Sequence, residues 1–216
     1  KLVNILLDKG DRDIGLIGWE QGDATWLGRW EGYKTGVEKW NKDHPDDQAK
    51  LSEPQYAGTS SEGGSKAAEA LMAADPGLDA LIPAGGGGDP LQGAIAAVER
   101  AGKTKDIDIV STDFLPDLGE RLKNGSMAGE SGGHYCDPLF SFMMVYNAIK
   151  GNYTGIEGKF EDVQFPYLYV SSPEDYADYE KYFVDKLPYT KDELVSMSQL
   201  SLDDLKQAAS KLSIQD

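Results

Sequence analysis

Short apolar segments alternate with longer segments of helical periodicity along residues 1–151. Residues 1–9 carry leucine and isoleucine at helical spacing and stop at Gly10, which predicts a first helix that ends at a glycine. The segment 13–18, which is apolar after Asp13, is typical of a short buried strand. Over 25–42, apolar and mostly aromatic residues return every three or four positions, so this segment is predicted to be an amphipathic helix.

The same alternation continues to residue 150. It predicts strands at 50–57, 78–83, 106–112 and 127–131, and helices at 61–74, 89–101, 116–123 and 137–150. Strands that alternate with helices in this way form a parallel sheet covered by helices on both faces. The predicted fold class is therefore α/β, with a Rossmann-like parallel sheet. Ligands of such sheets bind beyond the carboxyl ends of the strands, which selects the segments 18–29, 57–61, 84–89, 112–116 and 131–137.

The last part of the chain changes in character. The helix 137–150 is apolar nearly all round, so burial on more than one side is expected. After residue 152 the chain is rich in tyrosine and acidic residues, and a Ser201 cap predicts a final helix. We expect a ligand-binding lobe at 1–136, the apolar helix at 137–151, and an extension at 152–216 that packs on the rest and is not a separate domain.

The composition excludes several classes of protein. The formal net charge is −16, with 37 acidic against 21 basic residues, whereas a nucleic-acid-binding surface needs a face rich in Lys and Arg. The acidity is interpreted as a source of solubility. A single cysteine, Cys136, excludes an internal disulfide and a cysteine-based zinc site, and two histidines are too few for a multi-histidine metal site. Neither a metal nor another cofactor is expected.

No run of about 20 apolar residues is present, so no segment is expected to span a bilayer. The chain begins with neither an initiating methionine nor a signal peptide. We therefore expect it to be processed or truncated.

Several fragments, in this order and spacing, resemble the type I periplasmic binding proteins, the sugar-binding group that includes ribose-binding protein. The fragments are Arg29-Trp-Glu-Gly-Tyr33, Asp79-Ala-Leu-Ile-Pro83, the helix 91–103, Ile107-Asp-Ile-Val-Ser-Thr-Asp113, Leu122-Lys-Asn-Gly-Ser-Met-Ala128 and Asp137-Pro138. The resemblance covers residues 1–151 and concerns the second lobe of these two-lobed proteins. It implies that the first lobe is absent, that the helix 137–150 would pack on that lobe, and that otherwise this helix is exposed, repacked or paired with a second copy.

The resemblance implies two anchors for a sugar. Arg29 corresponds to an arginine that hydrogen-bonds a sugar ring, and Asp113 to an aspartate that accepts hydrogen bonds from sugar hydroxyls. A guanidinium fork and a carboxylate can each hold two neighbouring hydroxyls, which agrees with these roles. The alternatives are an Arg29 that only forms a surface salt bridge and an Asp113 that only caps the following helix.

Two positions depart from the family pattern. Gly87, within the run Gly85–Gly88, falls where the family has an asparagine, and Cys136 falls near its usual glutamine, with His134 two residues earlier. Either backbone N–H groups of Gly86 and Gly87 replace the missing side chains, or the ligand is not a plain pentose. His134 and Cys136 also have purely structural interpretations, as a hydrogen-bonding residue and an inert small residue.

The glycine run before Asp89 allows a second interpretation. Glycines between a strand and a helix can cradle a phosphate at the helix N-terminus. However, no Gly-Lys-Ser/Thr and no G-x-G-x-x-G follows, and Asp89 would place negative charge where a phosphate would sit. The other interpretation is that the glycines let the backbone approach a ligand or a lid, with Asp89 as a binding residue.

Aromatic side chains surround the end of the first predicted strand. A ring stacked on the apolar face of a sugar is common in small-molecule pockets. Trp19 directly follows Gly18 and is the favoured stacking residue, and Tyr56 is a weaker one. Trp26 and Trp30 share the same loop region, but helical periodicity favours a packing role for Trp30.

The function predicted from these patterns is ligand binding without covalent chemistry. No Gly-x-Ser-x-Gly elbow and no recognisable Cys/His pair supports an enzyme. By the resemblance, the chain would be the extracytoplasmic sugar-binding protein of an ABC-type importer, a periplasmic protein or a membrane-anchored lipoprotein, with a membrane permease as partner. The alternatives are the ligand-sensing domain of a LacI-type transcription regulator or of a sensor-kinase receptor. Self-association through the helix 137–150 is a further expectation, since exposed apolar patches drive association.

Overall fold

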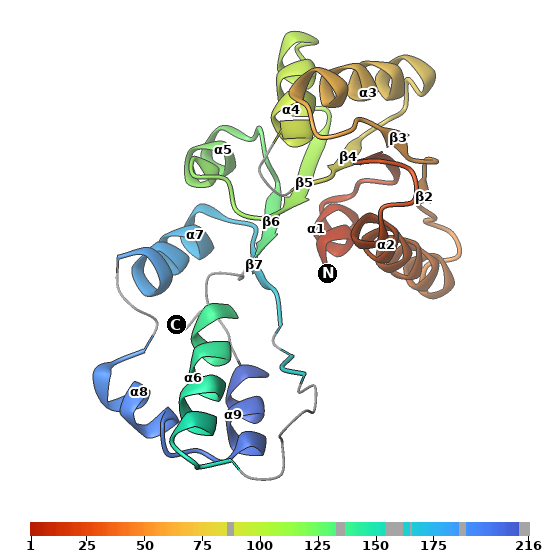
Figure 1. The fold of residues 1–216 in the computed structure, drawn as a ribbon. Helices are drawn as coiled ribbons and strands as arrows, with labels where there is room; N and C mark the ends of the chain where they lie inside the picture. The colour runs from red at the N-terminus through yellow and green to blue at the C-terminus, as the bar shows by residue number, and fades with distance from the viewer. Residues whose placement is uncertain (86–88, 133–136, 154–161, 165, 186–188, 212–216) are drawn as a thin grey trace. The chain divides into compact units, whose positions relative to one another are not determined.

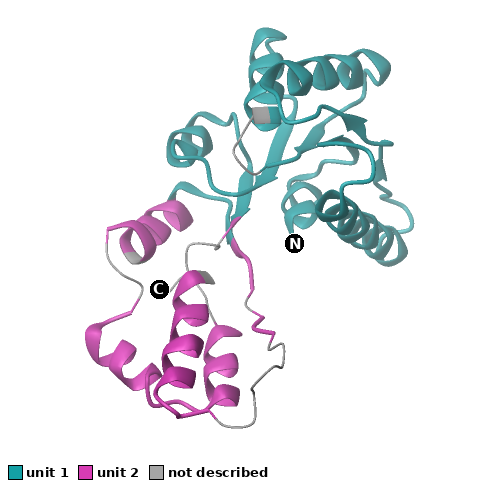
Figure 2. Ribbon diagram, viewed as in Figure 1, with its two compact units in different colours: residues 1–131, 169–173 teal, residues 132–168, 174–216 magenta. Residues whose placement is uncertain are grey.

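The computed structural model groups the chain into two compact units (Figure 2). Unit 1 contains residues 1–131 and 169–173, and unit 2 contains residues 132–168 and 174–216. The structure describes residues 1–85, 89–132, 137–153, 162–164, 166–185 and 189–211.

Unit 1 is organised by a mostly parallel sheet (Figure 1). Its strands are β1 (Asp13–Gly18), β2 (Lys50–Leu51), β3 (Gln55–Tyr56), β4 (Ala80–Pro83), β5 (Asp108–Thr112), β6 (Gly129–Gly132) and β7 (Leu168–Val170). The strand order is β2-β1-β4-β5-β6-β7, with β3 also paired to β1. β1 is parallel to β2, β3 and β4, β4 to β5, and β5 to β6. The predicted α/β class with a parallel sheet is confirmed.

Helices of unit 1 cover both faces of this sheet. They are α1 (Leu2–Lys9), α2 (Ala24–Asp43), α3 (Ser61–Ala74), α4 (Asp89–Arg100) and α5 (Leu118–Asn124). Alternate strand residues, Ile14, Leu16, Ala80, Ile82 and Val110, share one buried cluster with side chains of α1 and α2. On the other face α3 and α4 lie side by side, with α3 in contact with β1 and α4 with β4 (Figure 1). The period of two along each strand thus buries both faces.

Two glycines bring α3 and α4 into backbone contact. A Cβ atom added to Gly93 would lie 1.9 Å from the carbonyl oxygen of Ser61, and one added to Gly64 would lie 2.1 Å from that of Pro90. No side chain fits at either position. The two helices therefore pack more closely than larger residues would permit.

Strand β7 lies in the expected extension and was not predicted. The other predicted elements of unit 1 agree with the observed ones except at 50–57. This segment forms two short strands, β2 and β3, instead of one. The Ser52 hydroxyl accepts a hydrogen bond from the backbone N–H of Leu16 at 2.9 Å, so a side chain replaces a ladder carbonyl. Pro54 has no N–H to donate at the break. These two features explain the interruption.

Unit 2 contains α6 (Asp137–Ile149), most of α7 (Pro173–Tyr179), η2 (Glu180–Val184), α8 (Lys191–Met197) and α9 (Leu202–Ala209). The Nδ2 atom of buried Asn147 in α6 donates hydrogen bonds to the Tyr153 hydroxyl at 3.0 Å and to the Met197 carbonyl at 3.1 Å. α6 also contacts α9, whose Ser201 side chain accepts from the N–H of Asp204 as the predicted cap requires. The helix 137–149 is thus grouped with the residues that follow it. Its predicted contact with a further lobe stays a prediction.

α6 buries one side only among the described residues. Phe140 and Met143 are buried, while Phe142, Val145 and Ile149 are 61%, 59% and 80% exposed. The expectation of burial on more than one side of this helix is not met within the part of the chain that the structure describes. Self-association through the exposed side stays a prediction.

Candidate functional site

Three of the predicted site residues meet beyond the carboxyl ends of the strands. Trp19 follows β1, Asp113 follows β5, and Arg29 lies in α2. α2 begins at Asp23, whose side chain accepts a hydrogen bond from the N–H of Trp26 at 2.7 Å and caps the helix. The strand ends and this cap together position the three side chains.

Arg29 is the centre of this cluster. Its Nη2 atom lies 3.7 Å from Oδ2 of Asp113, an ion pair that is longer than a hydrogen bond. Its Cζ atom lies 4.9 Å from the centre of the Trp19 ring, within range of a cation–π interaction. The side chains of Arg29 and Asp113 are only 15% and 27% exposed. We name the set Arg29, Trp19 and Asp113 the arginine cluster.

One donor of the arginine cluster is unsatisfied. The Nη1 atom of Arg29 is buried and has no hydrogen-bond partner in the described part of the chain. A buried charged donor without an acceptor costs free energy, since it has lost water and gained nothing. A ligand oxygen that enters the cluster would remove this cost. The cluster therefore has the chemistry of a binding site for a polar ligand.

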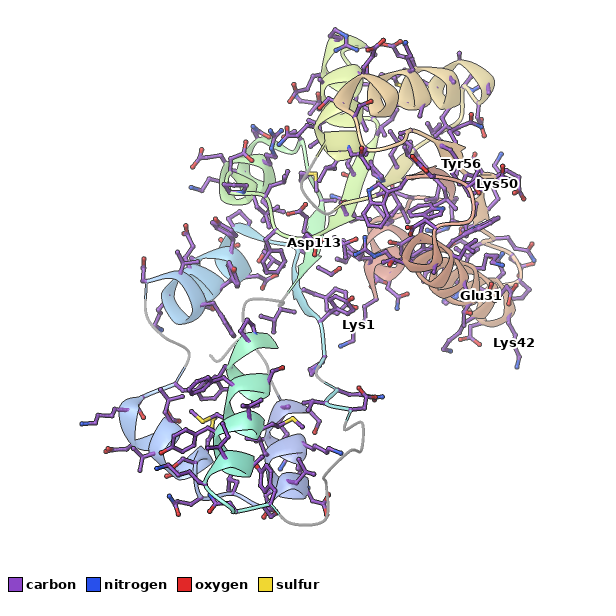
Figure 3. All side chains as sticks on the ribbon, in the orientation of Figure 1. Lys1, Glu31, Lys42, Lys50, Tyr56 and Asp113 are labelled. Atoms are coloured by element: carbon purple, nitrogen blue, oxygen red, sulfur yellow. The ribbon has the colours of Figure 1, made fainter. Side chains whose placement is uncertain are left out.

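Asp113 has an unusual backbone conformation. Its φ of 71° makes it the one non-glycine residue with positive φ among those described. Aspartate tolerates this left-handed region better than most residues. The Asp113 N–H donates to the carbonyl of Ser131 at 2.6 Å, which extends the pairing of β5 with β6 by one residue. Figure 3 labels Asp113 where this turn leaves the sheet. The turn is therefore held by the neighbouring strand.

Glu130 on β6 contacts the same turn, and it was not among the site residues predicted from the sequence. Its Oε2 atom accepts a hydrogen bond from the N–H of Leu115 at 2.7 Å, and its side chain is fully buried. Burial raises the pKa of Glu130 to about 8; the Leu115 N–H opposes this rise, and the nearby Asp113 carboxylate adds to it. A glutamate at the centre of a strand predicted to be buried was the available signal.

The first glycine of the run lies against the neighbouring strand β5. A Cβ atom on Gly85 would lie 1.7 Å from the carbonyl oxygen of Thr112 at the end of β5. One residue earlier along β5, the Ser111 hydroxyl donates to the Pro83 carbonyl at 2.8 Å. Close approach of the backbone is thus required at Gly85. Gly86 and Gly87 lie outside the described residues.

Of the other aromatic residues near β1, Trp26 and Trp30 have packing roles. Trp26 is fully buried in the core, and its ring contacts that of Tyr33 edge to face. Trp30 packs partly against the core, with Nζ of Lys34 5.0 Å from its ring centre, as its periodicity predicted. Tyr56 is 39% exposed and is labelled apart from Asp113 in Figure 3.

The other predicted site residues lie, at least in their side chains, outside the described part of the structure. His134 and Cys136 lie outside the described residues, and so does the side chain of Asp89, which begins α4. Among the described residues no group of His, Cys, Asp and Glu could hold a metal ion. No helix within the described ranges is long and apolar enough to cross a membrane.

Comparison with known proteins identifies the fold class. No protein-family model and no curated protein sequence matches the chain. Solved structures do match. The periplasmic binding protein of an arabinose ABC transporter from Shewanella sp. ANA-3, with bound L-arabinofuranose, has a TM-score of 0.65 and 21% identity over 93% of this chain and 62% of its own.

Two further solved structures have a similar fold. The substrate-binding protein of a sugar ABC transport system from Bordetella parapertussis has a TM-score of 0.63 and 14% identity, over 88% of this chain and 59% of its own. An ABC transporter solute-binding protein from Bacillus halodurans, with bound myo-inositol, has a TM-score of 0.61 and 23% identity, over 83% of this chain and 59% of its own. The chain thus has the fold of the periplasmic sugar-binding proteins of ABC transport systems. It spans about three fifths of the length of these structures.

Proposed function

We propose that the chain is the ligand-binding part of an extracytoplasmic solute-binding protein, and that it binds a monosaccharide or a similar polyol without chemical conversion. The observation that carries the proposal is the arginine cluster. Arg29 presents a buried donor that has no partner among the described residues, beside the Asp113 carboxylate and on the face of Trp19. Adjacent ring hydroxyls need both a donor and an acceptor, and the less polar face of the ring suits an aromatic plane.

The ligands of proteins with this fold support the choice of a polyol. Structures similar to this one hold L-arabinofuranose, D-fucose, D-allose and myo-inositol. All four are small, uncharged rings with several hydroxyl groups. We propose that the ligand of this chain belongs to the same chemical class and closes the cluster by hydrogen bonds to Arg29 and Asp113.

A titration followed by NMR tests this proposal. The ¹⁵N-labelled protein is titrated with each of the four compounds, because NMR detects binding even in the millimolar range. Saturable shifts are expected at the Trp19 indole and the Arg29 side chain for at least one compound. The Arg29→Ala variant is expected to bind about 10- to 100-fold more weakly, since charge-assisted hydrogen bonds are lost.

The matched control is Arg100→Ala. Arg100 is 58% exposed in its side chain and pairs with Glu69 across α3 and α4, away from the cluster. Its replacement is expected to leave the titration unchanged. Unchanged affinity in Arg29→Ala, or turnover of any of the four compounds, would overturn the proposal.

A role in an ABC-type importer outside the cytoplasm is part of the same proposal. A solute-binding protein of this kind delivers its ligand to a membrane permease from outside the cytoplasm, periplasmic or anchored as a lipoprotein. Cell fractionation with an antibody against the chain checks the location. An exclusively cytoplasmic protein would instead support a ligand-sensing domain of a regulator.

A further inference from the structure

Glu130 is the only buried acidic side chain in the described part of the structure. It lies on β6 opposite Ser111, at the point where β5 is about to leave the sheet. A carboxyl group is costly in such a position unless it has partners. The proposed ligand contacts do not include this side chain.

Its contact is with the turn that carries Asp113. Phe114 and Leu115 are both buried, so the backbone N–H of Leu115 is removed from water and needs an acceptor. Oε2 of Glu130 provides it at 2.7 Å. Together with the hydrogen bond from the Asp113 N–H to Ser131, this contact ties the turn to β6 on both sides of Phe114.

We propose that Glu130 is a positioning residue, which holds the turn 113–115 in the conformation that directs Asp113 toward Arg29. The left-handed backbone at Asp113 is unfavourable for most residues and persists only when neighbouring contacts impose it. The Glu130–Leu115 hydrogen bond is such a contact. This inference rests on the proposed function only for its effect on the ligand; the effect on the turn is independent.

The charge state of Glu130 makes the positioning sensitive to pH. With a pKa of about 8, the side chain is mostly a neutral acid at pH 7. Its Oε1 atom has no hydrogen-bond partner among the described residues, so an ionised form would be poorly solvated. The charged groups that act on it are Asp113, Asp117 and Arg121. Arg121 lowers the pKa but is already held by Asp117 at 2.9 Å. Above pH 8 a second carboxylate forms near Asp113, and the turn is expected to loosen.

Three variants separate the alternatives. Glu130→Gln keeps an acceptor for the Leu115 N–H and stays neutral at every pH. Glu130→Leu removes the acceptor. Glu120→Gln is the control, since Glu120 is exposed on α5 and pairs only with Lys123 among the described residues. All three are made in the full chain.

The first measurement is hydrogen exchange of the Leu115 amide at pH 6.5 without ligand. The wild type, Glu130→Gln and Glu120→Gln are expected to protect it equally, and Glu130→Leu is expected to exchange at least about 10-fold faster, as expected for a lost buried hydrogen bond. Equal protection in a folded Glu130→Leu variant would overturn the inference. If that variant does not fold, the pH profile of Glu130→Gln decides.

The second measurement is the affinity for the monosaccharide or polyol that the wild type binds best in the titration above, from pH 6 to 9.5. Wild type and Glu120→Gln are expected to lose at least about 3-fold in affinity with a midpoint near pH 8, and Glu130→Gln is expected to show a flat profile. The same alkaline loss in Glu130→Gln would overturn the role in positioning. If none of the four compounds binds, the proposed function fails. The present inference is then decided by the NMR chemical shift of the Asp113 amide as the pH passes 8. This shift is expected to change in wild type and to stay constant in Glu130→Gln.

Discussion

Two arginines of unit 1 lie at opposite ends of the sheet and differ in how fully they are bonded. Arg12 precedes β1 and stacks on Trp40 with its Cζ 4.6 Å from the ring centre; Arg29 stacks on Trp19 at 4.9 Å. Each also pairs with an aspartate, Arg12 with Asp47 at 2.5 Å and Arg29 with Asp113 at 3.7 Å. The same three residue types thus occur twice.

The two sets differ in their remaining hydrogen bonds. Arg12 donates from Nε to Asp47 at 2.7 Å, and from Nη1 to the carbonyls of Leu7 and Asp11 at 2.8 and 2.7 Å. Arg29 leaves Nη1 buried without a partner among the described residues. A satisfied guanidinium stabilises the fold, whereas an unsatisfied one is available to a ligand. Residue type alone would not distinguish these roles.

The largest effect that sharpens this comparison is expected at Glu130, whose buried Oε1 atom also has no hydrogen-bond partner among the described residues. Its folded pKa of about 8 lies above its unfolded value, so the folded state binds the proton more tightly and stability falls as pH rises through 8. From pH 5 to pH 8 the free energy of unfolding of the wild type should fall by about 3 kcal/mol more than that of Glu130→Gln. Urea denaturation at both pH values measures this difference. An equal fall in the free energy of unfolding of wild type and Glu130→Gln would show that Glu130 is not a neutral acid in the folded protein.

The next largest effect is expected on the free energy of unfolding when Arg12 or Arg29 is replaced. Arg12→Ala is expected to lower the free energy of unfolding by about 2 kcal/mol, because it removes hydrogen bonds to two carbonyls and a carboxylate. Arg29→Ala should lower it by less than about 0.5 kcal/mol, since its ion pair is long and one donor is unsatisfied. Urea denaturation of both variants at pH 7 is the test. If Arg29→Ala were the more destabilised, Arg29 would be a structural residue and the comparison would be wrong.

The smallest effect concerns Asp47. The hydrogen bond from Arg12 lowers the pKa of Asp47 below its usual value, so its stabilising contribution is present above pH 4 and is lost as pH falls through the lowered pKa. Asp47→Asn should therefore be slightly less stable than wild type at pH 7, and the two should converge at an acid pH below the lowered pKa of Asp47. Thermal unfolding at both pH values measures this convergence. No convergence would indicate that the Arg12–Asp47 pair is without effect on stability.

Much of the fold could be predicted from the sequence because both faces of the sheet are buried. The segments 14–18 and 80–83 contain no polar side chain, and the helices between them show clear periodicity. The split of 50–57 was not predicted, because it depends on a hydroxyl that reaches the backbone of Leu16 from another strand. A periodicity argument contains no such long-range contact.

The site was predicted in part for a similar reason. Trp19 and Asp113 each follow the end of a strand, and the topology alone brings such positions together. The topology selected these segments, but Arg29 and Asp113 were predicted as ligand anchors through the family resemblance. Glu130 was missed because its importance depends on the buried N–H of Leu115, fifteen residues away. Likewise, the partner of Arg12 is Asp47, at a sequence separation of 35, and no local pattern indicates that pair.

The backbone contact between α3 and α4 has a consequence for protein engineering. A library that randomises residues to change the specificity of the chain would often include whole helices. Gly64 and Gly93 should be kept fixed in such a library, because any Cβ atom there would overlap a carbonyl of the other helix. Glu62, Lys66 and Arg100 of the same helices are exposed, so these positions are expected to accept variation and the attachment of dyes or a surface linker.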